Sequence, residues 1–399
     1  MEIINLMHRI FYDNKRQPII QGGIFLKDGT LFTGCVPAAD FTGILNECEA
    51  EKTLRLCEQA LAPSLIGKDI RIPDIDFLLI DATAFAGIPI DDFSINRYFT
   101  LALSIAVYKA YACKTNVELY ELFAYLMGSE SVTLPCPQFT VLTDQKQTRD
   151  LRIREFSVTP LGAATVRSAF ELCMSVAGAV HENPLYAHGV INQAYDDREI
   201  LDFLGMTLGK IAFASDAGIC ALALNIDASK FYDKEHGKYF FNHTLCSAEE
   251  LINFYGELTE TYPVYSIEDG LDHNDWEKWR LMTETLGNKT QIVGNALFSS
   301  DPERLNFIAR NNIATAIAIK PYACSTILEI MQSILACKQN KLNIIIAHPF
   351  GEAEDAFMTD LTIGTSAGQI KIGSCPPSEW LARYERLFAV ENALRGISS

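Results

Sequence analysis

Polar side chains follow five apolar runs in the C-terminal half of the chain, where β-strands would end. They lie in YSIEDG (265–270), VGNAL (293–297), IAIKP (317–321), AHPFGEAED (347–355) and GQIKIG (368–373), and are Glu268, Asn295, Lys320, His348 and Lys371. Acids, amides and lysines at the ends of alternating strands and helices are typical of polar chemistry in a barrel mouth. The neutral amides of Asn295 and Asn225 indicate that the chemistry usual for such a barrel mouth has been lost or changed.

The elements around these residues alternate between short apolar runs and helical stretches. The runs are CALALNID, YPVYSIED, TQIVGNAL, ATAIAIKP and LNIIIAHPF, and CSTILEIMQSILACKQNK is a typical helical stretch between them. This alternation predicts an α/β fold with parallel strands and covering helices, either an open sheet or a (β/α)8 barrel. In a barrel, all the polar side chains would meet at one end.

The N-terminal part has a different pattern. Residues 1–40 predict strands, with a hairpin at LKDGTLF, where Asp-Gly separates two apolar runs. From about 43 to 128, apolar residues recur at helical spacing. Two prolines in LPCPQFTV (134–141) then force an extended path and mark a boundary. We therefore predict a smaller α+β domain over 1–130 and a second domain over 134–399.

Composition limits the possible partners and compartment. With 33 basic and 50 acidic residues, the net charge of −17 argues against a nucleic-acid partner. No apolar run is long enough to predict a membrane span. The 11 cysteines show no zinc or disulfide spacing, and the N-terminus lacks a signal-peptide pattern, so we expect reduced thiols and a cytoplasmic location.

The order of these motifs resembles the enolase family nearly from end to end. The resemblance is carried by FYDNKRQP, LPCPQFTVL, ALNIDASKFY, YSIEDG followed by DWEKW, AIAIKP and GEAEDAFMTDLTIGTSAGQIKIG. It implies an enolase-type (β/α)8 barrel preceded by a smaller α+β N-terminal domain. It also implies four retained catalytic positions: Lys320 as the proton-abstracting base, Lys371 as the enolate-stabilising lysine, His348 as a substrate contact and Glu155 as a catalytic-site glutamate.

The metal site implied by the resemblance is altered. Enolases bind Mg²⁺ through three carboxylates at strand ends, and the matching positions here are Asn225, Glu268 and Asn295. Because Mg²⁺ is a hard cation that needs charged oxygen ligands, we expect a weak or absent site. Asp227, two residues after Asn225, would face the same side of a continuing strand and is a candidate replacement ligand.

Other family motifs also differ. Ala187, in LYAHGV, falls where the resemblance places the acid that assists leaving-group departure. Pro349 and Phe350 stand where a phosphate-holding motif has an arginine and a serine. A proline and a phenylalanine offer no side-chain donor to a phosphate.

Three functions stay open at this point. The first is a non-catalytic enolase homologue with an interaction or regulatory role. The second is a lyase of the enolase type acting through Lys320 on a different, unphosphorylated acid, and the third is a genuine enolase converting 2-phosphoglycerate to phosphoenolpyruvate. The resemblance further implies a homodimer, and the first function would require a protein partner whose identity is unknown.

Overall fold

The computed structural model forms two compact units, which we describe separately. It describes residues 2–12, 18–38, 47–69, 71–85, 95–144, 153–191, 196–214, 219–241, 244–295, 297, 302–347, 356–373 and 379–396. Unit 1 comprises Met1–Thr133, Lys320–Leu335 and Ala347–Ser366, and unit 2 comprises Leu134–Ile319, Ala336–Ile346 and Ala367–Ser399. Two segments that follow barrel strands in the chain are therefore grouped by their contacts with unit 1.

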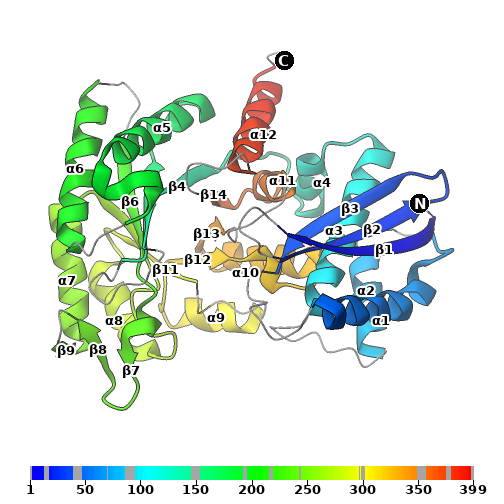
Figure 1. Cartoon of the computed structure of the whole chain (residues 1–399), viewed down its shortest axis with the longest axis horizontal. Coiled ribbons are helices and arrows are strands. Elements are labelled where there is room, and N and C mark those ends of the chain that lie inside the picture. The colour runs from blue at the N-terminus through cyan, green and yellow to red at the C-terminus, as the bar shows by residue number, and fades with distance from the viewer. Residues whose placement is uncertain are drawn as a thin grey trace. The chain divides into compact units, whose positions relative to one another are not determined.

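Unit 1 contains an antiparallel sheet of three strands (Figure 1). The strands are β1 (Ile3–Tyr12), β2 (Pro18–Leu26) and β3 (Leu31–Pro37), in the order β1-β2-β3. The predicted hairpin is confirmed: β2 and β3 pair across a tight turn in which Gly29 has a φ of +85°. A glycine tolerates this left-handed conformation because it has no Cβ.

Unit 1 also contains helices. They are α1 (Glu47–Leu65), α2 (Asp74–Phe85), α3 (Ile95–Thr115), α4 (Leu119–Leu126) and α11 (Phe357–Gly364), with the short η3 (Pro321–Ala323) and the start of α10 (Ile327–Gln339). Of these, α1 packs against β1, and α3 packs against β2 and β3. The helical pattern before residue 128 is broken at Asn116, which has a φ of +54° and separates α3 from α4. The core helix α3 lies so close to β3 that a Cβ on Gly34 would stand 2.2 Å from the Ala102 carbonyl oxygen.

A buried carboxylate joins α2 to α3 and α10 within unit 1. Asp76 accepts hydrogen bonds from Ser104 Oγ (2.6 Å), Tyr108 Oη (3.0 Å) and the Leu328 amide (2.8 Å). Ser104 Oγ in turn accepts from the Ile327 amide. These bonds satisfy the first amides of α10, which a helix leaves without partners. Burial nevertheless raises the pKa of Asp76 to about 6.

Unit 2 is a closed barrel of eight strands, which confirms the barrel that the family resemblance implied. The strands are β4 (Cys136–Thr143), β5 (Glu155–Pro160), β6 (Cys220–Asn225), β10 (Val264–Glu268), β11 (Gln291–Gly294), β12 (Ala316–Ile319), β13 (Asn343–Ile346) and β14 (Gly368–Ile372). All neighbouring pairs are parallel except those made by β5, which runs antiparallel to β4 and β6. The start of β5 therefore lies at the same end of the barrel as the ends of the other strands.

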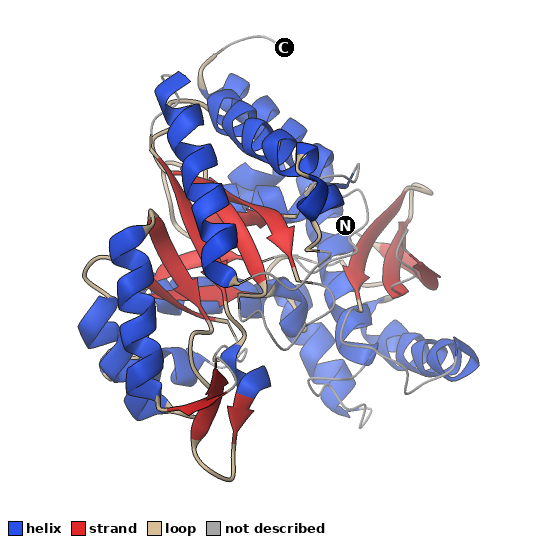
Figure 2. Cartoon of the chain, turned by 60° about the vertical axis from the view of Figure 1, so that its left-hand side comes forward, coloured by secondary structure: helices blue, strands red, loops and turns tan. Residues whose placement is uncertain are grey.

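Helices of unit 2 lie along the outside of these strands (Figure 2). They are α5 (Val166–Glu182), η1 (Pro184–Gly189), α6 (Asp197–Ala214), α7 (Ala248–Thr261), α8 (Trp276–Leu286), α9 (Pro302–Arg310) and α12 (Glu379–Leu394). A small sheet of β7 (Tyr232–Asp233), β8 (Lys238–Phe241) and β9 (Thr244–Cys246) follows the short η2 (Ala228–Phe231). The described helices include none that is both long and apolar enough to cross a lipid bilayer.

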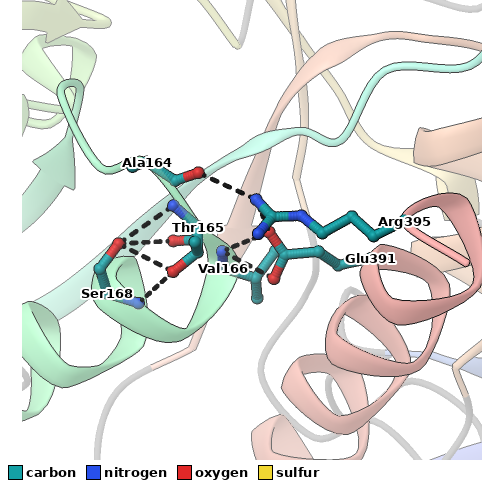
Figure 3. Close-up of polar contacts among 6 residues, drawn as sticks. All are labelled: Ala164, Thr165, Val166, Ser168, Glu391 and Arg395. Carbon is teal, nitrogen blue, oxygen red and sulfur yellow. Dashed lines mark hydrogen bonds and ion pairs between the residues drawn. The ribbon is translucent and has the colours of Figure 1, made fainter. Parts of the chain in front are cut away.

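A carboxylate on the C-terminal helix α12 is hydrogen-bonded to the start of α5 (Figure 3). Thr165 caps α5 through a capping box with Ser168. Glu391 accepts from the Val166 amide at 3.2 and 3.1 Å, and Arg395 pairs with the same carboxylate at 2.9 Å. A carboxylate at a helix N-terminus satisfies free amides and interacts favourably with the helix dipole.

Candidate active site

The strand register of unit 2 brings the acids and amides of the site to one end of the barrel. Asn225, the last residue of β6, pairs in register with Glu268, the last residue of β10. Glu155, the first residue of β5, pairs with Asn225 on the other side because β5 is antiparallel. Asn295 follows β11, the strand next to β10. These four residues therefore lie at the same end of the barrel.

Glu268 is the one carboxylate retained among the three predicted metal positions, and both of its oxygens are engaged. Its Oε1 accepts a hydrogen bond from Asn295 Nδ2 at 2.7 Å. Its Oε2 is ion-paired with Lys371 Nζ at 2.6 Å. The residue is only 3% exposed. A metal ion approaching Glu268 would have to displace an ammonium group, an amide or both.

The ammonium of Lys371 is stabilised in its charged form. Burial by itself lowers the pKa of a lysine, but the carboxylates of Glu268, Glu155 and Asp269 outweigh it, so the pKa of Lys371 is raised. Lys371 therefore places a positive charge on Glu268 at neutral pH. In a divalent-metal site, the metal ion would supply the positive charge beside Glu268.

Asn225 makes the second amide contact of the site. Its Nδ2 donates to Glu155 Oε2 at 3.1 Å, and both residues are 9% exposed. With its amide nitrogen turned to Glu155 and that of Asn295 turned to Glu268, neither Oδ1 accepts a hydrogen bond from the part of the chain that the structure describes. The amides thus act as donors to carboxylates.

Asp227, the candidate replacement ligand, follows β6 in a left-handed conformation with a φ of +57°. Its Oδ2 lies 2.6 Å from Arg154 Nη1 and 3.0 Å from Lys230 Nζ. The strand does not continue to Asp227, because η2 begins at Ala228. The reason given for placing its side chain beside Asn225 was therefore wrong, and two cations compete for its carboxylate.

For Lys320 we describe only its position relative to the neighbouring elements, and the remaining predicted residues lie outside the described residues. Lys320 directly follows β12 and precedes η3, and it belongs to unit 1. His348, Pro349 and Phe350 lie outside the described residues, as does the side chain of Ala187. Their predicted roles stay predictions.

A buried amide network at the opposite end of the strands was not anticipated. Gln369 accepts from Gln138 at 2.9 Å and donates to Gln291 at 2.9 Å, and Asn343 also donates to Gln291. Gln369 and Lys371 are two residues apart on β14, so their side chains share a face of the strand. The network therefore fixes the strand that presents Lys371. Polar residues beginning apolar strands were the sequence signal for it.

The donor set does not fit the divalent metal expected from the resemblance. One carboxylate and two amides supply little charge, and a lysine already neutralises the carboxylate. Among the described residues, no group of three or more His, Cys, Asp and Glu side chains is arranged to hold a metal ion. The ammonium and the two amide N–H groups instead donate to the carboxylates.

These features define the class: a (β/α)8-type barrel with one antiparallel strand and a ring of acids, amides and a lysine at the strand ends. Residues 131–398 match the family model described as the C-terminal TIM barrel domain of enolase. The chain therefore belongs to the enolase family. The match covers the barrel and all the site residues discussed above.

Proposed function

We propose that this enolase-family protein does not dehydrate 2-phosphoglycerate and instead acts as a non-catalytic member of the family, with an interaction or regulatory role. The observation that carries the proposal is the ion pair between Lys371 and Glu268. In the family reaction, Mg²⁺ supplies positive charge that stabilises the enolate. Here a side chain of the protein holds the retained carboxylate in place of the ion.

The same contact would remove a second function from the reaction. The resemblance assigns Lys371 to enolate stabilisation, but its ammonium is committed to Glu268 at 2.6 Å. Asn295 occupies the other oxygen of that carboxylate. Loss of one electrostatic contributor in an active site typically lowers the rate by about a hundredfold or more. Losing the metal charge and the free lysine together leaves little catalysis of this type.

A second candidate is a lyase of the enolase type with an altered, unphosphorylated substrate. It is favoured by the presence of Glu155 and Lys371 at one end of the barrel and of Lys320 directly after β12. A lysine base requires a substrate proton of lowered pKa. A substrate acid without phosphate would not need the arginine and serine that Pro349 and Phe350 replace. Exchange of the α-proton of 2-hydroxy acids with deuterated solvent would identify this activity.

The test of the main proposal is phosphoenolpyruvate formation by the purified full-length protein with 2-phosphoglycerate and Mg²⁺. We expect no product above the buffer background. The matched control is Lys320→Ala, which removes the family base. Product formed by the wild type and lost in Lys320→Ala would refute the proposal and identify a genuine enolase. Product formed equally by both proteins would indicate a contaminating enzyme, and a preparation freed of it must then show none.

The remaining expectations concern assembly and location. By family resemblance we propose a homodimer, which light scattering at micromolar concentration would test. A monomer at that concentration would contradict it. A non-catalytic role also requires a protein partner, and the 11 cysteines without disulfide spacing lead us to propose a cytoplasmic location for both proteins. Affinity capture from native lysate would identify it.

A further inference from the structure

Two buried amide oxygens at the end of the barrel carry an inference about the ligand of this site. Asn225 and Asn295 flank Glu268 on either side, at the ends of β6 and β11. Each turns its amide nitrogen to a carboxylate. Both Oδ1 atoms are buried and accept no hydrogen bond from the described residues. Asn225 as a whole is nine-tenths buried.

The neighbouring carboxylates determine these orientations. Turning either amide over would place its oxygen against an oxygen of Glu155 or Glu268, replacing an attraction by a repulsion. The free groups that the two asparagines present are therefore acceptors. A buried acceptor without a donor is unfavourable by about 1–3 kcal/mol, so this end of the barrel is suited to a ligand that supplies a donor or a cation.

Carboxylates are concentrated around these oxygens. Glu155 and Glu268 each accept a hydrogen bond from one of the two asparagines, so a carboxylate lies against each amide. Together with Asp269, these carboxylates also act on the Lys371 ammonium. An anionic group such as a phosphate would meet acceptors and like charge here. A cation would meet oxygen atoms and opposite charge.

We infer that the ends of β6, β10 and β11 form a site for a singly charged cation, either K⁺ or the ammonium group of an amine. Neutral amide-type oxygens replace the hydration shell of K⁺ and accept hydrogen bonds from an ammonium. Mg²⁺ instead needs charged ligands in near-octahedral geometry. This inference rests on the proposed function, because a resident divalent metal at Glu268 would occupy the same place.

The experiment is a thermal-unfolding series on the full-length wild-type protein, prepared in tetramethylammonium chloride. That cation has the same charge but no N–H donor, and it is too bulky to approach two oxygens closely. It is replaced at constant ionic strength by KCl, ammonium chloride or methylammonium chloride. Above the dissociation constant, the midpoint should rise by roughly 1–2 °C per tenfold increase in the binding cation.

The different cations in this series distinguish a site for a bare ion from a site for the ammonium group of an amine. A rise with K⁺ and ammonium but not with methylammonium assigns a bare-ion site. A rise with methylammonium as well assigns the head group of an amine. If K⁺, ammonium and methylammonium raise the midpoint no more than tetramethylammonium does, the inference is wrong.

Variants locate the effect. Asn295→Leu removes one acceptor and should abolish the cation-dependent rise, and Asn225→Leu should do the same. Asn311→Leu, at an exposed amide in the loop after α9, should retain it. A rise that survives both site variants would overturn the assignment, and if neither site variant folds, the wild-type series decides alone. The activity assay separates the two proposals, because inactivity without cation binding overturns only this inference.

Discussion

Replacement of Lys371 by methionine tests how the site is held together. Lys371→Met keeps the length of the side chain and removes its charge, which leaves Glu268 with the Asn295 hydrogen bond but without its cation. Glu268 is 3% exposed, so solvent screens the remaining charge only weakly. Removing one member of a buried ion pair typically lowers the free energy of unfolding by about 3–5 kcal/mol. We expect a loss in that range.

The assay is urea unfolding followed by tryptophan fluorescence, because the fully buried Trp279 reports on the barrel unit. Lys230→Met is the matched control, because it also removes a lysine that is paired with a carboxylate. Lys230 is 44% exposed, however, and its partner Asp227 keeps its ion pair with Arg154. An exposed pair contributes at most about 1 kcal/mol.

A double variant completes the test. Glu268→Gln added to Lys371→Met removes the stranded charge, so the pair of changes should destabilise the protein by less than the sum of the two single changes. Added Mg²⁺ should stabilise Lys371→Met but not the wild type, since the variant leaves Glu268 free to bind a cation. The reasoning is refuted if Lys371→Met destabilises no more than Lys230→Met does, or if the double variant shows no coupling.

Three further changes test the surroundings of the site. Because burial raises the pKa of Asp76 from 3.8 to about 6, the folded protein holds this proton more tightly than the unfolded chain, and the stability from this group falls by about 3 kcal/mol as the pH rises from 3.8 to 6. Asp76→Asn should remove that fall in urea unfolding, and an unchanged pH dependence would contradict the assignment. Gly34→Ala should destabilise by about 3 kcal/mol or more, because its Cβ would lie 2.2 Å from the Ala102 carbonyl oxygen; a variant that melts like the wild type would show that β3 and α3 are further apart. Glu391→Ala should cost about 1–2 kcal/mol by freeing the Val166 amide, and unchanged hydrogen exchange at the start of α5 would contradict this role.

The sequence predicted those features that depend on local pattern. Apolar runs located β6 and β10 through β13, and the Asp-Gly pair at Asp28 located the hairpin of β2 and β3. The antiparallel direction of β5 was not predicted, since an apolar run looks the same whichever way the strand runs. The break between α3 and α4 at Asn116 was also not predicted, because the apolar spacing continues across it.

The candidate site divides in the same way. The acids and amides at the strand ends could be identified from their positions after apolar runs, and the register places Glu155, Asn225 and Glu268 side by side. The distance between Lys371 and Glu268 could not be predicted, because β14 and β10 are not neighbouring strands of the barrel. Asp227 shows the limit most plainly. Alternation along a strand predicted its direction, but the strand ends before it and the backbone turns into a left-handed conformation.

The group that lies beside Glu268 when a divalent metal is offered distinguishes a metal-free site from a catalytic one. The decisive measurement is an anomalous difference map from crystals of the wild-type protein grown with Mn²⁺, a detectable substitute for Mg²⁺. We predict no peak within ligand distance of the Glu268 carboxylate, and Lys371 Nζ still paired with Oε2. A peak at about 2.2 Å from Glu268, with Lys371 displaced and the Asn225 and Asn295 oxygens turned to the ion, would contradict the central claim.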